Sequence, residues 1–240
     1  MAKARPRVRA ALETRTLPLQ ARSRSTFDAI LNFAGETLAD AGSRTFSINA
    51  VCERAGLTPP AVYRYFPNKY ALLKALAERL MQAEDEAALA FMVNWPIPRS
   101  EGELIAEVRK RVGKVVAVTS SFPGSVAILR TLRTTPVMRE IRAASTTQIA
   151  VRWFARLRQT FPNADPGRLQ RGALLGLEIS TRFIELIVEG EIQEPGEGGN
   201  DILDEVAVML GRFYWHLGST ERPILEGRKR MGLSSTRERG

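Results

Sequence analysis

The 240-residue sequence contains one cysteine and one histidine, and these two scarcities exclude several kinds of site. A single cysteine, Cys52, leaves no internal disulfide, and beside apolar neighbours it is interpreted as a small core residue. A multi-histidine metal site or a Ser-His-Asp triad would have to be built around His216, which is interpreted as an interface or surface residue. The sequence therefore predicts no catalytic residue, no metal site and no cofactor.

Long apolar runs and phosphate-binding glycine patterns are also missing. No stretch of about eighteen apolar residues occurs, and the first residues lack the charged-then-apolar pattern of a secretory signal. We therefore expect a cytoplasmic protein without a membrane partner. No Walker or Rossmann glycine pattern is present, and the glycine-rich segment 194–199 carries acidic residues, which oppose phosphate binding and suit a flexible connection.

The formal net charge of +9 lies at the two ends of the chain. Residues 1–26 hold seven Lys or Arg and one acid, residues 219–240 hold six and three, and the remaining 22 basic and 22 acidic residues cancel. We interpret residues 1–24 as a basic disordered arm that follows DNA phosphates or enters the minor groove, with a merely solubilising tail as the alternative. Residues 219–240 are interpreted as a flexible basic tail.

The pattern of residues 45–56 predicts the first helix of a helix-turn-helix unit. Ser47 is a good N-cap, because its hydroxyl accepts a hydrogen bond from the free amides of the first turn. Ile48 and Val51 then fall three apart, so that one face of the helix packs. Gly56 stands where the chain leaves the helix in a left-handed conformation, which glycine adopts without strain. A short, well-defined turn is the consequence.

The next helix presents aromatic and cationic side chains with no acidic residue among them. Thr58 is placed to cap this helix, and Val62 and Phe66, four apart, are predicted to face inward. Lys69 opens the helix that follows, where its ammonium and the helix-end amides can hold a phosphate. Phenol and guanidinium groups suit phosphates and base edges, and the outward-facing set is predicted to be Pro60, Ala61, Tyr63, Arg64 and Tyr65.

Taken together, these features resemble the DNA-binding domain of TetR-family transcriptional regulators. The resemblance covers roughly residues 25–80 and rests on Ala55-Gly56-Leu57-Thr58, on Tyr63-x-Tyr65-Phe66, and on Asn68-Lys69 followed by Leu72 and Leu73. It implies a DNA-binding domain over residues 25–75 whose contacts to DNA are made by Ser47, Thr58, Pro60, Ala61, Tyr63, Arg64, Tyr65 and Lys69.

Helical periodicity continues through the rest of the chain, and no alternating pattern is long enough to predict a strand. The expected fold is all-α with about nine helices: the N-terminal three-helix unit, whose first helix ends at Gly42, and a helical effector-binding and dimerisation domain over residues 76–218. The further helices are expected from about Asn68 to near Phe91, from about residue 100 to Phe122, and over about 124–134, 136–160, 166–188 and 201–217.

The last two helices carry apolar stripes that are predicted to form a homodimer interface, with burial inside one subunit as the alternative. The predicted interface residues are Leu169, Ala173, Gly176, Leu177, Ser180, Ile184, Leu203, Val206, Leu210 and Phe213. The resemblance also implies a small-molecule pocket in the body. Its candidate lining is Phe91, Met92, Phe122, Met138, Trp153, Phe154 and Phe183, which indicates a mainly apolar effector.

The sequence therefore favours a homodimeric transcriptional repressor that a small molecule releases from a palindromic double-stranded DNA operator. Two alternatives stay open: a ligand-independent or architectural DNA-binding protein that uses its basic tails, and a helical enzyme with a borrowed DNA-binding domain. The absence of catalytic constellations argues against the enzyme.

Overall fold

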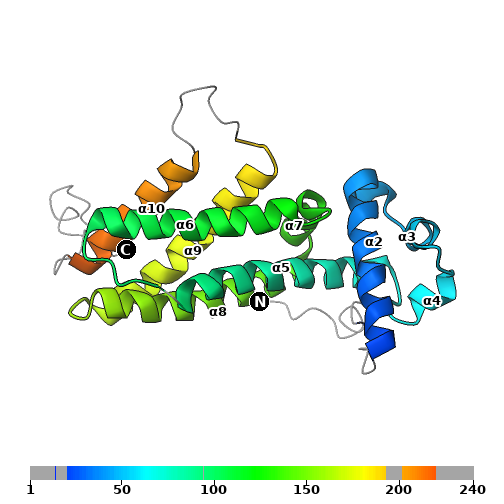
Figure 1. Cartoon of the computed structure of the whole chain (residues 1–240), viewed down its shortest axis with the longest axis horizontal. Coiled ribbons are helices and arrows are strands. Elements are labelled where there is room, and N and C mark those ends of the chain that lie inside the picture. Colours follow the sequence, from blue (N-terminus) through cyan, green and yellow to red (C-terminus); the bar gives the residue numbers. More distant parts are fainter. Residues whose placement is uncertain (1–13, 15–20, 94, 193–201, 220–240) are drawn as a thin grey trace, which may run out of the picture.

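The computed structural model describes residues 14, 21–93, 95–192 and 202–219, and these residues contain helices and no strand. The predicted all-α fold is confirmed, and the described part of the chain has nine helices (Figure 1). Their bounds are α2 Ala21–Thr45, α3 Ile48–Ala55, α4 Pro59–Tyr63, α5 Lys69–Val93, α6 Glu101–Ser121, α7 Ser125–Thr134, α8 Pro136–Thr160, α9 Pro166–Val188 and α10 Ile202–Ser219.

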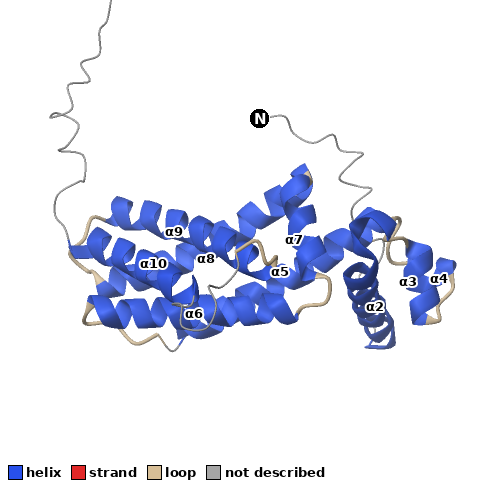
Figure 2. Cartoon of the chain, turned by 90° about the horizontal axis from the view of Figure 1, so that it is seen from above, coloured by secondary structure: helices blue, strands red, loops and turns tan. Residues whose placement is uncertain are grey.

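The three helices α2, α3 and α4 form a unit at one end of an elongated molecule, and α5 runs from this unit into the body (Figures 1 and 2). Their shared core contains Ile30, Leu38, Val51 and Phe66, each at most 1% exposed. The same core includes residues of α7, which packs against α2. The two halves of the molecule are thus joined by α5 and also by the docking of α7.

The body is a bundle of α5, α6, α8, α9 and α10, in which α6 packs chiefly on α10 and α8 on α9 (Figure 2). Its centre holds an aromatic cluster in which Trp153 meets Trp95 at 4.9 Å and Tyr214 at 5.4 Å between ring centroids. The helix starts follow local signals. The Ser100 hydroxyl accepts from the Glu103 amide, and the Asp165 carboxylate accepts from the Arg168 amide.

Two predicted boundaries change in the N-terminal unit. Helix α2 begins at Ala21, so Arg24 lies on a helix and the arm predicted for residues 1–24 is too long by its last residues. The remainder of that arm, apart from Thr14, and the tail after Ser219 lie outside the described residues. The predicted end at Gly42 is a break in the helical backbone (φ 68°, ψ 172°), and α2 runs on to Thr45.

The apolar stripe of α9 is buried within this chain, so its prediction as a dimer surface is wrong. Eight of the predicted interface residues are buried, and Leu203 and Phe213 are half-buried against the same core; the buried ones are Leu169, Ala173, Gly176, Leu177, Ser180, Ile184, Val206 and Leu210. Gly172 and Gly176 do permit a close approach, but the helix that approaches is α10, through Leu217 and Tyr214. An amphipathic pattern shows which face of a helix is buried, but it does not show which helix or subunit packs against that face.

No single described helix is long and apolar enough to span a membrane; only the pair α6 and α7, bent by 103° between them, meets that criterion together.

Candidate functional site

The helix-turn-helix geometry follows the local signals in the sequence. The Ser47 hydroxyl accepts from the Ala50 amide at 3.2 Å and so caps α3. Gly56 ends that helix in the left-handed conformation (φ 62°, ψ 29°), and the Leu57 amide donates to the Cys52 carbonyl at 3.0 Å. These bonds fix the path from α3 to α4 within a few residues.

Helix α4 presents its outer side to solvent while its inner side is anchored in the core. Val62 and Phe66 are fully buried. Thr58, Pro60, Tyr63 and Arg64 are exposed and Ala61 is half-buried, so the outer side of α4 is accessible. Thr58 takes the N-cap position of α4, but its hydroxyl makes no capping hydrogen bond.

Tyr65 does not point outward, and that part of the prediction is wrong. Its side chain is 3% exposed, its ring packs edge-on against Phe27 at 5.8 Å, and its hydroxyl lies 3.0 Å from the Ser23 hydroxyl. The reason is that Tyr65 follows Val62 by three residues, so helical spacing places it on the inward face beside Phe66, and the Tyr65 amide still donates to the Val62 carbonyl at 3.0 Å. Tyr65 holds α2 against the end of α4.

Lys69 and Asn68 share the start of α5. The Asn68 side-chain oxygen accepts from the amides of Tyr70 at 2.9 Å and Ala71 at 3.0 Å. Two of the helix-end amides predicted to hold a phosphate are therefore already bonded. Lys69 is half-buried, and its ammonium lies 5.5 Å from the centre of the Tyr70 ring.

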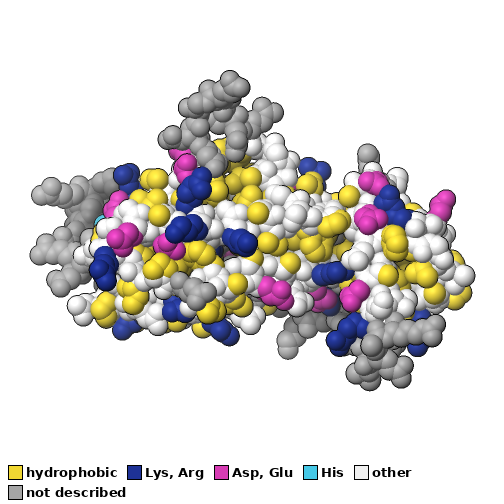
Figure 3. All heavy atoms as spheres, viewed as in Figure 1, with side chains coloured by type: hydrophobic (Ala, Val, Ile, Leu, Met, Phe, Trp, Pro, Cys, Tyr) yellow, Lys and Arg dark blue, Asp and Glu magenta, His cyan; other side chains and the backbone are white. Residues whose placement is uncertain are grey.

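The exposed residues Arg54 and Arg64 have different neighbours. Arg54 at the end of α3 forms an ion pair with Asp40 of α2. Arg64 instead lies over the Tyr65 ring at 5.8 Å. On the rest of the visible face, cationic and acidic side chains are interspersed (Figure 3), in agreement with the neutral body expected from the sequence.

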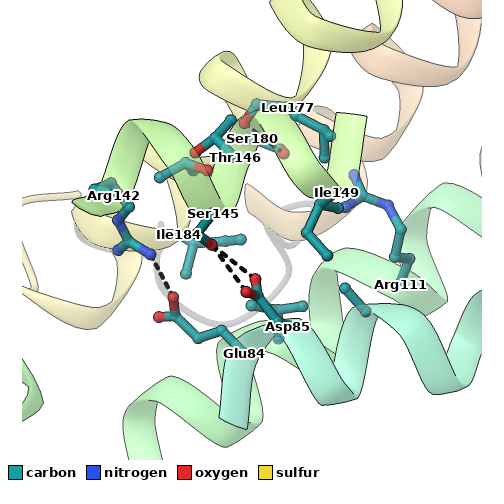
Figure 4. Close-up of a pocket in the computed structure, with 13 residues that line it drawn as sticks. Glu84, Asp85, Arg111, Arg142, Ser145, Thr146, Ile149, Leu177, Ser180 and Ile184 are labelled. Atoms are coloured by element: carbon teal, nitrogen blue, oxygen red, sulfur yellow. Dashed lines mark hydrogen bonds and ion pairs between the residues drawn. The ribbon is translucent and has the colours of Figure 1, made fainter. Parts of the chain in front are cut away.

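A cavity of about 50 Å³ lies in the body between α5, α6, α8 and α9. Figure 4 shows Arg142 and Glu84 at one end, Asp85 and Ser145 in the middle, and Arg111 at the other end beside Ile149. The complete lining is Glu84, Asp85, Ala88, Arg111, Val115, Arg142, Ser145, Thr146, Ile149, Leu177, Ser180, Thr181 and Ile184.

Comparisons with known proteins agree with the helix-turn-helix geometry. A family model described as bacterial regulatory proteins of the tetR family matches residues 30–76. Over 54 residues the chain is 41% identical to the tetracycline repressor protein class C of Escherichia coli, a match that covers 22% of this chain and 25% of that protein. The chain carries a TetR-family DNA-binding domain.

The likeness to solved structures extends over most of the chain. A TetR-like transcriptional regulator from Rhodococcus sp. RHA1 aligns with a TM-score of 0.57 and 16% identity, over 84% of this chain and 97% of that one. A TetR variant from Acinetobacter baumannii AYE in complex with minocycline aligns with a TM-score of 0.52 and 18% identity, over 80% and 97%. At these identities the alignments show that the body, like the domain, has the fold of TetR-family regulators.

The cavity behind the TetR-family domain is not the one predicted. None of the seven candidate pocket residues lines it. Met92, Met138 and Trp153 are buried in the core, Phe122 borders two hollows on the surface, and the other three are half-buried: Phe91, Phe154 and Phe183. Three residues predicted for the dimer interface line the cavity instead, namely Leu177, Ser180 and Ile184.

A usable signal for the cavity was present in the sequence. Arg111 interrupts an apolar stripe of α6 that includes Val108, Val112 and Val115. A charged residue among core positions is either paired or functional, because burial of an isolated charge is unfavourable. Glu84 interrupts the buried stripe of α5 in the same way.

Two of the four charged residues at the cavity, Glu84 and Arg142, belong to an ion-pair network. Arg142 contacts Glu84 and, at 3.6 Å, Glu185 of α9. Glu185 also contacts Arg133 of α7 at 3.1 Å, and Arg133 pairs with Glu189, whose pKa it lowers. The network therefore links the wall of the cavity to α7, the helix that packs against α2.

Asp85 stands apart from that network. Both of its carboxylate oxygens accept from the Ser145 hydroxyl, at 2.9 and 3.0 Å. Burial raises the pKa of this carboxyl, the hydrogen bond from Ser145 lowers it, and the nearby Glu84 raises it.

Proposed function

We propose that this chain is a homodimeric transcriptional repressor that binds a palindromic operator and is released when a small molecule occupies the cavity. The observation that carries the proposal is the pairing of a helix-turn-helix with an exposed Thr58, Pro60, Tyr63 and Arg64 surface and a polar cavity in the body. A single reading helix contacts too few base pairs to select one genomic site, so two-fold repetition is required.

The proposed DNA contacts are phosphate contacts from Tyr63, Lys69 and Ser47 and base contacts from Ala61 and Arg64, with Thr58 and Pro60 beside them. Tyr65 supports the surface from behind. Tyr63 is 41% exposed although it is large and aromatic, which favours a role outside the core.

The proposed dimer surface is the outer side of α9 and α10. Three large apolar side chains are exposed there, Leu174 at 40%, Leu175 at 51% and Met209 at 42%. Leu175→Arg should give a monomer that no longer protects a palindrome, as measured by analytical ultracentrifugation and footprinting. Val151→Arg, at an exposed site on α8, is the matched control and should remain dimeric. A dimeric Leu175→Arg protein would place the interface elsewhere.

Selection of genomic fragments by the purified protein, followed by sequencing and footprinting, tests the function as a whole. A repressor of this kind should enrich a palindrome with half-sites one or more helical turns apart, about 34–36 Å between centres per turn. Enrichment without a common sequence would support the alternative of an architectural DNA-binding protein.

A further inference from the structure

Arg111 is a buried cation without a counter-charge. It is 2% exposed, and its Nε and Nη2 atoms are enclosed without a hydrogen-bond partner. Among the described residues no carboxylate forms an ion pair with it, and burial lowers the pKa of the guanidinium. The carboxylates of the cavity are engaged elsewhere: Glu84 by Arg142 and Thr119, and Asp85 by Ser145.

The aromatic neighbours of Arg111 do not replace the missing anion. The guanidinium carbon lies 5.2 Å from the centre of the Trp153 ring, a cation–π contact that supplies neither a counter-charge nor a hydrogen-bond acceptor for the N–H groups. Tyr214 is fully buried, and burial raises its pKa to about 12 while Arg111 lowers it, so the phenol stays neutral at physiological pH.

We propose that the cavity binds an organic monocarboxylate whose carboxylate pairs with Arg111. The planar fork of a guanidinium matches a carboxylate in geometry and charge. The apolar body of the acid would lie against Val115, Ile149 and Leu177. Glu84 at the other end of the cavity and Asp85 in its middle disfavour a second negative charge there (Figure 4). This assignment names the effector class of the proposed repressor and rests on that function only for its regulatory consequence.

Paired acids and amides test the assignment directly. Acetate, butyrate, hexanoate and benzoate are titrated by calorimetry against their primary amides, with succinate and inorganic phosphate as further arms. Short acids belong in the panel because the free space of about 50 Å³ holds only a few water-sized groups. At least one acid should bind ~10-fold or more tightly than its amide, as a charge-assisted hydrogen bond predicts.

Three variants test whether Arg111 causes the preference for the acid over its amide. Arg111→Met should bind acid and amide alike, and Arg111→Lys should retain a weaker preference for the acid, which keeps the test usable if the Met variant folds poorly. Lys114→Met removes a charge from the exposed side of the same helix and should behave like the parent protein. Without ligand, Arg111→Met should melt at a higher temperature than the parent, because an uncompensated buried charge is gone.

Several outcomes would overturn the assignment: amides binding as tightly as acids, an unchanged preference in Arg111→Met, or no acid binding at about 10 mM, a concentration that detects millimolar affinity. Phosphate binding more tightly than every acid would leave a general anion site. If succinate bound as tightly as butyrate, the proposal that Glu84 and Asp85 disfavour a second carboxylate would be wrong. Arg111-dependent binding of an acid that leaves operator affinity unchanged would keep the cavity assignment and refute the ligand-released repressor.

Discussion

At the scale of single residues, Tyr63 and Tyr65 differ in their exposure to solvent although they are only two positions apart. Tyr63 is exposed on α4, whereas Tyr65 is buried and its hydroxyl meets Ser23 of α2. Neighbouring residues of the same type therefore divide between the proposed DNA surface and support of the core. The division arises because Tyr65 shares the inward face of this turn with Val62 and Phe66, whereas Tyr63 lies on the opposite face.

Substitution of the two tyrosines should separate DNA affinity from stability. Tyr63→Ala should weaken binding to specific and random duplexes alike, with little change in the free energy of unfolding. Tyr65→Phe should lower the free energy of unfolding by about 1 kcal/mol and leave sequence preference unchanged. Urea denaturation and fluorescence anisotropy measure the two quantities. Equal losses of DNA affinity in both variants would contradict the assignment.

Lys69 offers a quantitative check on phosphate contact. Lys69→Ala should lower the slope of log affinity against log salt concentration by about 1, since one phosphate contact is lost. Anisotropy titrations at a series of salt concentrations measure this slope. A variant that binds both duplexes as tightly as the parent would rule out the proposed docking of α4.

Asp85→Asn should make the protein more stable at neutral pH. The native state binds the Asp85 proton more tightly than the unfolded state, so the free energy of unfolding falls as pH rises from the ordinary aspartate pKa of 3.8 through the raised native pKa. The amide removes this loss, and the partial exposure of the side chain keeps the effect small. Urea denaturation from pH 4 to 8 tests the expectation, and the difference should shrink toward pH 4. An equal difference at every pH would point to another cause.

At the scale of the elements, the main feature is the close packing of α10 against α9. A Cβ atom at Gly176 would stand 2.1 Å from the Tyr214 hydroxyl, whereas one at Gly102 of α6 would meet nothing within 4 Å. The small residues of α9 thus seat the partner helix of the same chain, and they also keep Tyr214 close to Arg111.

Two glycine-to-alanine substitutions should therefore have opposite effects. Gly176→Ala should destabilise the protein by about 1–3 kcal/mol through overpacking. Gly102→Ala should stabilise it by about 0.4–1 kcal/mol, because alanine restricts the unfolded chain. Thermal and urea denaturation measure both. A neutral Gly176→Ala would mean that α10 can move away from α9.

At the scale of the whole molecule, the N-terminal three-helix unit and the body are connected through helices that contribute to both. Helix α5 carries Leu72 in the core of the N-terminal three-helix unit and Asp85 at the cavity. The turn between α6 and α7 lies against α2, because a Cβ atom at Gly124 would stand 2.8 Å from the Gly35 carbonyl oxygen. A ligand that displaces α5 or α7 would therefore change the position of the reading helix.

Coupling of this kind is reciprocal. An acid that binds the cavity should lower operator affinity, and operator DNA should lower the affinity for the acid by the same factor, typically ~5–150-fold. Paired titrations of the acid with and without operator measure both values. Identical affinities in the two titrations would reduce the protein to a ligand-independent DNA-binding dimer.

The sequence by itself determined the local structure of the chain. Caps, glycine turns and helical spacing act within a few residues, and they predicted the all-α fold, the Ser47 cap, the left-handed Gly56 and most helix ends. The burial of Val62 and Phe66 followed from the same spacing. The same spacing places Tyr65, three residues after Val62, on the inward face, so its assignment to the outward set was a misinterpretation of the pattern.

Only the tertiary structure decided which element covers each apolar face. The stripe of α9 is the same whether α10, α8 or a second subunit packs on it, and the structure placed α10 and the cavity there. The cavity joins Asp85, Arg111, Arg142 and Ser180 from four helices distant in sequence. No local rule relates such residues, since their proximity depends on how the helices cross. The unpaired charge of Arg111 emerged only when all its neighbours were known.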